Sequence, residues 1–498
     1  MPFRPKIRRL FFTLFALVTI CWTTAAAAPV PMVPKWKYVV ANNVDYRSFD
    51  NGAMTINVTR SETPFTTYPH GRYPAGQDFV VSVDFADYTT GTITGPSTFL
   101  HSDTQLAIQW DADPINGVPV YSEIDIRRTT FNDGQENYSA IYSTQSVSGS
   151  VNILHQVDNV PGTANNGTFT IEKAGNNVTV SLKSTTDETL YSRIFSSIPF
   201  TDSEITVNLR TINGPRTGTS VRYANLQMDP VPYRIEDSFL AHQINEQGGN
   251  RNLLAFNVRD TSGDYVTGNM LTVNQLLAPS GSPVPIEPVQ FSGAYQELEG
   301  EYDAKDGQWH YESAFSPNSN FTTTFDGTLA VGTYRLQVTT DNGLLYSIPF
   351  LATPQVDLPV LSSTTFSSYK DSGGNLFINY KAPYDEVFLA AGLNTEAIAF
   401  VDAYEGATLS ARMEINMPTH LGHIAVPANV VQLFEAQGTD RRVTLILHEQ
   451  EGSNASFSTA APLIPAAGPP VAGDVNGDGK IGLDEAIHAL QIAAGGGQ

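Results

Sequence analysis

The sequence is poor in cysteine and in charged residues. Cys21 is the only cysteine among 498 residues, which excludes a fold held by a framework of disulfides. Only 16% of the residues are charged, and 28 Lys and Arg face 50 Asp and Glu, so the formal net charge is −22. Because phosphate binding needs clustered cations, nucleic acid is not an expected partner. The 41% of hydrophobic residues is enough to build sizeable cores, which excludes a wholly disordered chain.

Several familiar catalytic motifs are absent as well. The chain contains neither Gly-x-Ser-x-Gly nor His-Glu-x-x-His, and it has no glycine loop of the kind that binds phosphates. His420 and His423 lie three residues apart, but no third metal ligand is evident nearby. The sequence therefore favours a loop pair without a metal at these two histidines.

The first 27 residues have the pattern of a secretory signal peptide. An apolar stretch from Leu10 to Trp22 follows a basic end, and small residues from Thr23 to Ala28 suit cleavage after Ala27. The apolar stretch is shorter than the ~20 residues that span a membrane, so removal is favoured over anchoring. We expect a mature chain that is secreted, extracellular or at the cell surface, with no transmembrane anchor. The basic residues are Arg4, Lys6, Arg8 and Arg9.

The body of the chain has the pattern of a mainly β protein. Apolar residues alternate with polar ones over Phe79–Phe85, as a half-buried strand requires. Gly175 and two asparagines separate two further alternating runs, which predicts a hairpin. Because such strands continue for about 200 residues without helical periodicity, we expect one large two-sheet sandwich over residues 28–232.

Proline-containing joints divide the rest of the chain into two smaller modules and a linker. The expected boundaries are 233–354, 355–462 and, for the Pro-rich linker, 463–473. The run from Tyr334 to Val338, a turn at Asp341–Gly343 and the run Leu345–Phe350 form a predicted closing hairpin. This hairpin resembles the last two strands of immunoglobulin-like modules, which implies that both smaller modules are immunoglobulin-like β-sandwiches.

A calcium-binding loop is predicted close to the C-terminus. Oxygen ligands fall at positions 1, 3, 5, 7 and 12 of a twelve-residue loop, with Gly479 at position 6 where the sharp turn occurs. The seventh position contributes its backbone carbonyl, and the carboxylate at position 12 can bind through both oxygens. The expected cofactor is Ca²⁺. Its ligands are Asp474, Asn476, Asp478, Lys480 and Glu485.

The loop and the helix predicted after it, over residues 474–495, resemble half of a type I dockerin with an EF-hand-like loop. Dockerins dock carbohydrate-active enzymes onto cohesins, which implies docking to a cohesin-like partner or pairing between copies of this repeat. The sequence departs from the family pattern in two ways. It has one repeat where dockerins have two, and Glu485 stands where they usually have Asp.

Residues 28–232 resemble the concanavalin A-like jelly roll of lectins and family 16 glucanases. The Ser122–Ile126 segment carries Glu123 and Asp125, which match the first two acids of the glucanase pattern. Arg127 or Arg128 stands where the next acid belongs, and an arginine cannot donate a proton near neutral pH. No catalytic residue is therefore assigned.

Two aromatic residues close to this strand, Trp110 and Tyr121, could stack on a sugar. With Glu123 and Asp125 they are the candidate ligand-binding residues. The alternative is structural: the two acids pair with Arg127, and Trp110 belongs to the core.

Three hypotheses for the whole chain follow. The first is an exported calcium-binding protein without catalytic activity that binds a glycan or a surface protein. The second is a secreted glycoside hydrolase that acts on polysaccharides and has a dockerin-like tail. The third is a purely structural protein of the cell surface.

Overall fold

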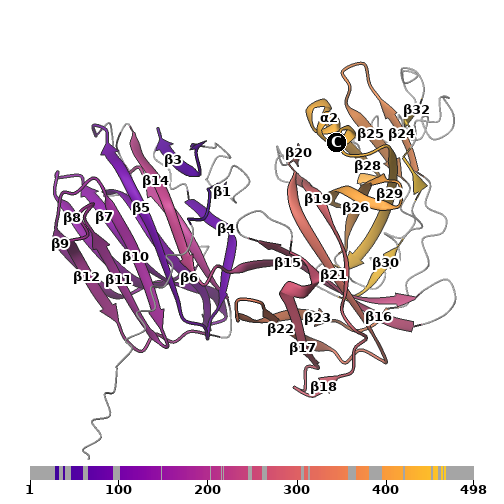
Figure 1. Ribbon diagram of the computed structural model, residues 1–498, viewed down its shortest axis with the longest axis horizontal. Coiled ribbons are helices and arrows are strands. Elements are labelled where there is room, and N and C mark those ends of the chain that lie inside the picture. The colour runs from indigo at the N-terminus through magenta and orange to yellow at the C-terminus, as the bar shows by residue number, and fades with distance from the viewer. Residues whose placement is uncertain are drawn as a thin grey trace, which may run out of the picture.

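The computed structural model describes most of the chain between residues 29 and 466 (Figure 1). The predicted leader, the calcium loop and its helix, and His420 lie outside the described residues. The described ranges are 29–32, 38–39, 46–59, 65–93, 101–146, 149–201, 204–214, 216, 218–244, 250–260, 266–303, 308–311, 315–356, 366–380, 395–418, 421–449, 453–457, 461–463 and 465–466.

The described residues form a mainly β structure, as the sequence predicts. They contain one short α-helix, α2 (Ala428–Glu435), and one turn of 3₁₀ helix, η1 (Gly268–Met270). In this part of the chain, no helix combines the length and the apolar character needed to cross a bilayer.

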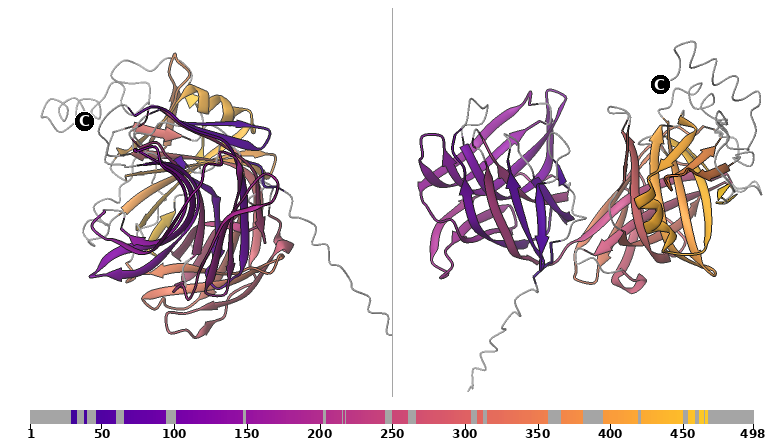
Figure 2. Two further views of the ribbon diagram at one scale, coloured as in Figure 1. Left: turned by 90° about the vertical axis from the view of Figure 1, so that its left-hand side faces the viewer. Right: turned by 90° about the horizontal axis from the view of Figure 1, so that it is seen from above.

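The first unit is a sandwich of two seven-stranded antiparallel sheets, which curve over one another in Figure 2. The first sheet has the order β1 (Tyr38–Val39), β4 (Phe65–Pro74), β13 (Glu204–Ile212), β6 (His101–Ile115), β7 (Val118–Phe131), β8 (Glu136–Gln145) and β9 (Asn152–Pro161). The second has the order β12 (Thr189–Phe195), β11 (Asn177–Lys183), β10 (Gly167–Ala174), β5 (Phe79–Thr90), β14 (Thr219–Asp229), β3 (Ala53–Val58) and β2 (Arg47–Asp50).

The alternation seen in the sequence explains how this sandwich forms its core. The core-facing residues Phe79, Val81, Val83 and Phe85 of β5 are at most 2% exposed, and Phe85 stacks on Phe169 of β10 with ring centroids 4.3 Å apart. The predicted hairpin is confirmed as β10 and β11, and Gly175 in its turn has φ +57°. Glycine adopts this left-handed conformation at little cost, which suits a tight connection.

The second unit contains three sheets, seen to the right of the sandwich in Figure 1. A ten-stranded sheet comprises β15 (Tyr233–Ile244), β16 (Asn250–Asp260), β21 (Ser316–Asp326), β19 (Gln290–Asp303), β27 (Thr408–Pro418), β26 (Thr395–Glu405), β29 (Asp440–Glu449) and β30 (Ala455–Phe457), with β20 (Gln308–Tyr311) on β19 and β31 (Ala461–Pro462) on β29. The two four-stranded sheets are β18 (Pro283–Val284), β17 (Leu271–Leu277), β22 (Gly332–Thr340) and β23 (Leu345–Ala352), and β28 (His423–Val426), β25 (Leu376–Tyr380), β24 (Phe366–Lys370) and β32 (Pro465–Ala466).

This arrangement differs from two independent immunoglobulin-like modules. The closing hairpin is present as β22 and β23, but one sheet crosses the expected boundary at residue 354, because β19 pairs in parallel with β27. Ion pairs lie on both sides of this parallel pairing. On the β19 side, Arg259 pairs with Glu297, and on the β27 side, Nε of Arg412 lies 2.7 Å from Oδ1 of Asp402. Alternation predicts that a segment is a strand, but it does not identify the distant strand with which it pairs.

The sandwich and the second unit are joined by direct contacts. β4 of the sandwich contacts β15 and β23 of the second unit. The Tyr73 hydroxyl on β4 donates to the carbonyl oxygen of Pro230 in the connecting segment over 2.7 Å, and within the second unit the Tyr233 amide donates to the hydroxyl of Tyr346 over 3.0 Å. All three tyrosines belong to one buried cluster that runs from the first unit into the second. The core of the sandwich is therefore continuous with part of the core of the second unit.

Candidate functional site

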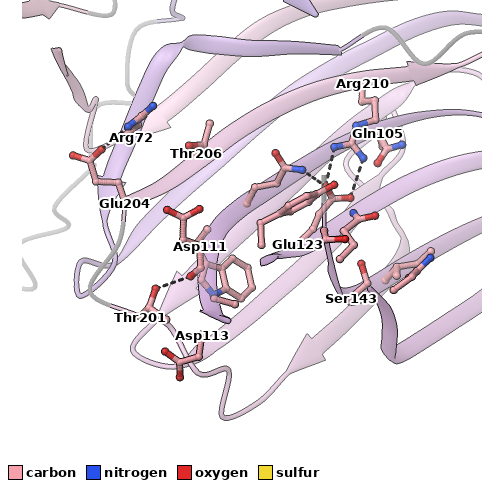
Figure 3. A pocket seen from close by; sticks show the side chains of 18 of the residues that line it. Arg72, Gln105, Asp111, Asp113, Glu123, Ser143, Thr201, Glu204, Thr206 and Arg210 are labelled. Carbon is pink, nitrogen blue, oxygen red and sulfur yellow. Dashed lines mark hydrogen bonds and ion pairs between the residues drawn. The ribbon is translucent and has the colours of Figure 1, made fainter. Parts of the chain in front are cut away.

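A groove of about 1490 Å³ lies on the outer face of the first sheet of the sandwich (Figure 3). Its floor is made by side chains of β13, β6, β7 and β8, the four strands that lie side by side in the middle of that sheet. Along each strand, alternate residues point into the sandwich core, and those between them point into the groove.

The strand register arranges these groove-facing residues in rows. One row crosses the floor as Arg210, Gln105 and Arg127, on β13, β6 and β7. Four residues further along the strands, a parallel row crosses as Thr206, Gln109, Glu123 and Ser143. The floor is therefore polar, while the other face of the same strands is apolar.

Glu123 is fixed in the floor by a two-point ion pair. Its side chain is 2% exposed and accepts hydrogen bonds from both terminal nitrogens of Arg210, at 3.0 and 2.8 Å, and from Gln109. Burial acts to raise the pKa of Glu123, but Arg210 outweighs it, so the pKa lies below its ordinary value. Glu123 is therefore ionised and neutralised within the floor.

Asp125 lies beneath the groove surface and pairs with Arg127. Its Oδ1 accepts from Nε of Arg127 over 2.6 Å, its Oδ2 accepts from Nη2, and the residue is fully buried. Burial raises the pKa of Asp125 to about 6, with the charge of Glu123 adding to the effect and Arg127 opposing it. Asp103 also accepts from Arg127, over 3.3 Å, so this guanidinium bridges two buried carboxylates.

The predicted site residues do not all face the groove. Tyr121 is half-buried and lines it together with Glu123, whereas Asp125 does not line it. Trp110 borders the groove, but it is only 2% exposed and packs on Phe200 with ring centroids 4.8 Å apart, so most of the ring belongs to the core.

Of the two arginines at the third acid position, Arg127 is on the groove side. Arg128 is on the core side, where its guanidinium lies over the ring of Tyr88 at 5.4 Å and pairs with Glu136 at 2.9 Å. The structural alternative for the acids is thus confirmed for Asp125 and Arg127. For Glu123 the partner is different, because it pairs with Arg210.

Sequence reasoning missed the contribution of β13. In its sequence Thr206, Asn208 and Arg210 alternate with apolar residues, so the signal for a polar face was present. What the sequence does not contain is the strand order and register that let Arg210 on β13 reach Glu123 across β6.

One end of the groove carries more exposed charges. Arg72 pairs with Glu204 at 3.2 Å, and Asp111 and Asp113 also line the groove, on the same side of Figure 3 as Glu204. Burial raises the pKa of Glu204, and Arg72 opposes this. The Thr201 hydroxyl donates to the backbone oxygen of Asp111 over 2.6 Å. Within the described ranges, no three His, Cys, Asp or Glu side chains gather in a way that would hold a metal ion.

Comparisons with known proteins give structural likenesses alone. No family model and no curated protein matches the sequence. Among solved structures, the chain is similar to the CBM2 module of the evolved Dit of Lactobacillus casei BL23 phage J-1, at 12% identity and a TM-score of 0.27, over 41% of this chain and 95% of that chain.

Two further solved structures have comparable values. A Bacillus licheniformis β-glucanase matches at 12% identity and a TM-score of 0.25, over 41% of this chain and 98% of that chain. Lectin II from Ulex europaeus matches at 12% identity and a TM-score of 0.25, over 40% and 95%. At these values the likenesses assign no function to the chain.

Proposed function

We propose that this chain is an exported, non-catalytic protein that binds a glycan in the groove of its first sandwich. The observation that carries the proposal is the groove floor itself. It offers fixed polar groups beside the half-buried ring of Tyr121, while Glu123 is neutralised by Arg210. Small polar groups at defined positions beside an aromatic surface suit a ligand with many hydroxyls and apolar ring faces.

The same floor disfavours hydrolysis by two carboxylates. A retaining glycoside hydrolase needs two carboxyl groups ~5–5.5 Å apart that both reach the scissile bond. Glu123 reaches the groove, but Asp125 is fully buried and bound to Arg127. Without movement of Arg127, Asp125 has no route to a leaving group.

The alternative is a glycoside hydrolase, and one observation favours it. The pKa of Glu123 lies below its ordinary value and that of Asp125 is raised to about 6, so their environments separate the two acids in the manner expected of a nucleophile and a proton donor. A ligand that displaced Arg127 would expose such a pair.

The test is a binding and activity assay on the same samples of the full mature chain. The chain is passed over immobilised neutral and acidic polysaccharides, and released reducing ends are measured in the flow-through. Tyr121→Ala should lose retention. The control Tyr404→Ala, which removes a half-buried aromatic ring on β26 away from the groove, should keep it.

The outcomes separate the hypotheses. Retention without sugar release, lost in Tyr121→Ala, supports a glycan-binding protein. Sugar release that Glu123→Gln abolishes favours the hydrolase. Retention on none of the polysaccharides overturns the proposal and leaves binding of a surface protein, or a purely structural role, as the better hypothesis.

Calcium binding at the C-terminal loop is the second part of the proposal. It rests on the residue types at the five ligand positions, Asp474, Asn476, Asp478, Lys480 and Glu485. Docking through this repeat, to a cohesin-like partner or to a second copy, depends on it, because the loop needs the ion to hold its shape.

A further inference from the structure

The groove continues beyond the edge of the first sandwich. Part of its wall comes from the second unit, from residues that follow Glu123 by 112 to 226 positions in the sequence. This wall contains residues of three strands, β15, β22 and β23. They are Ile235, Ser238, Arg335, Ser347, Ile348 and Pro349.

Contacts at the joint hold this wall in place. β4, which carries Arg72 at the end of the groove, contacts both β15 and β23. Tyr233 and Tyr346 are on the same strands as the wall residues Ile235 and Ser347, and both belong to the buried cluster that continues from the sandwich. The second unit therefore presents its part of the groove in a fixed position relative to the floor.

The size of the combined groove suits an extended ligand. Its volume of about 1490 Å³ is larger than the ~300–1,000 Å³ of pockets that enclose a single drug-sized molecule. A monosaccharide would leave most of it empty. A linear oligosaccharide could lie on the floor and reach the wall as well.

The charges along the groove suit a neutral ligand. Its arginines are matched by carboxylates, since Arg210 pairs with Glu123 and Arg72 with Glu204. Arg335 is exposed and forms no hydrogen bond or ion pair with another described residue. The groove also exposes the carboxylate of Asp113, which offsets this positive charge. A polyanion would meet these carboxylates on a chain whose net charge is already −22.

On the basis of the proposed function, we infer that the second unit completes the glycan site and that the ligand is a linear, neutral polysaccharide chain spanning both units. The sandwich floor binds one part of the chain. The wall formed by Arg335, Ser238 and their neighbours binds the next rings. Because both parts bind one molecule, the affinity rises steeply once the ligand is long enough to reach the wall.

The experiment compares ligand length in the full mature chain by titration calorimetry. The probes are a linear neutral gluco-trisaccharide, the corresponding octasaccharide and a uronate octasaccharide. In the unmodified protein the neutral octasaccharide should bind at least about tenfold more tightly than the trisaccharide. In Arg335→Ala and in Ser238→Trp this gain should be lost, so that the octasaccharide binds no more tightly than the trisaccharide does to the same variant. Both positions are exposed, so folding should be retained.

Arg442→Ala is the matched control. Arg442 is an exposed arginine on β29 of the second unit and does not line the groove, so the variant should keep the full gain with length. The inference is overturned if Arg335→Ala and Ser238→Trp both keep the gain, if the unmodified protein shows none, or if the uronate octasaccharide binds more tightly than the neutral one. If neither these oligosaccharides nor any immobilised polysaccharide binds, the proposed function itself fails.

Discussion

Removing Arg210 tests the reasoning about the groove floor most directly. In Arg210→Ala the carboxylate of Glu123, 2% exposed, loses both hydrogen bonds from the guanidinium and keeps only the one from Gln109. Removing one partner of a buried ion pair costs about 3–5 kcal/mol, because the remaining charge stays buried without compensation. For a domain of 150–250 residues, this corresponds to a fall in Tm of roughly 6–20 °C.

The loss should depend on pH with a defined sign. In the unmodified protein the pKa of Glu123 is lowered, so its stabilising contribution is present above its ordinary pKa of about 4.3 and is lost as the pH falls through the folded value. In the variant, Arg210 no longer opposes the effect of burial, so the pKa of Glu123 is raised and the unfolding free energy falls as the pH rises above about 4.3. The difference between the two proteins is therefore large at pH 7 and smaller at pH 4.

Calorimetric melting of the full chain at both pH values measures this difference, and it also separates transitions if the units melt independently. Arg72→Ala is the control, because it breaks an Arg–Glu pair in the same sheet whose side chains are 47% and 30% exposed. Such a pair is worth about 0–1 kcal/mol. Equal losses for Arg210→Ala at pH 4 and pH 7, or a loss as large in Arg72→Ala, would refute the account of an uncompensated buried charge.

Three further predictions follow from other parts of the chain. The pKa of Asp125 is raised to about 6, so ionisation of this carboxyl group lowers the unfolding free energy as the pH rises from 4 to 7. Between these pH values the unfolding free energy of Asp125→Asn should rise by up to roughly 3 kcal/mol relative to that of the unmodified protein, as measured by urea unfolding at each pH. Gly214 has φ +56°, and an added Cβ would lie 2.3 Å from the carbonyl oxygen of His101; Gly214→Ala should lower the unfolding free energy by more than about 1 kcal/mol, and an unchanged melting curve would contradict this. Glu485→Gln should weaken calcium binding strongly in calorimetry of the full mature chain, since a two-oxygen ligand becomes a neutral amide; unchanged affinity would disprove the ligand assignment.

The sequence predicts the first sandwich well, because its strands have one apolar face each. In the run Phe79–Phe85 every second residue from Phe79 onward is apolar and buried, and among the residues between them only Val80 is apolar, on the exposed side. The hairpin around Gly175 is equally local, since turn residues and flanking alternation lie within a few positions of one another. Such local patterns predict strands and turns without information about which distant strands pair.

The joins between distant strands were not predictable in this way. Arg210 meets Glu123 across 87 positions of sequence, and the two strands are not direct neighbours, since β6 lies between them. The parallel pairing of β19 with β27 likewise leaves no local signal, so a proline-containing joint was expected to separate modules that share a sheet. Register and strand order are set by packing over the whole sheet, which a single sequence does not display.

The ion pairs of the floor bear on the proposed function, because they suit binding of a ligand better than hydrolysis. A nucleophile must be available to attack, but Glu123 already has Arg210 and Gln109 as hydrogen-bond donors. The same bonds keep its side chain in one position and satisfy its charge before any ligand arrives. Under the proposed function, such a groove would lose little free energy to the ordering of side chains when a neutral chain binds, so the bonds that restrain Glu123 as a nucleophile would also favour retention of the ligand.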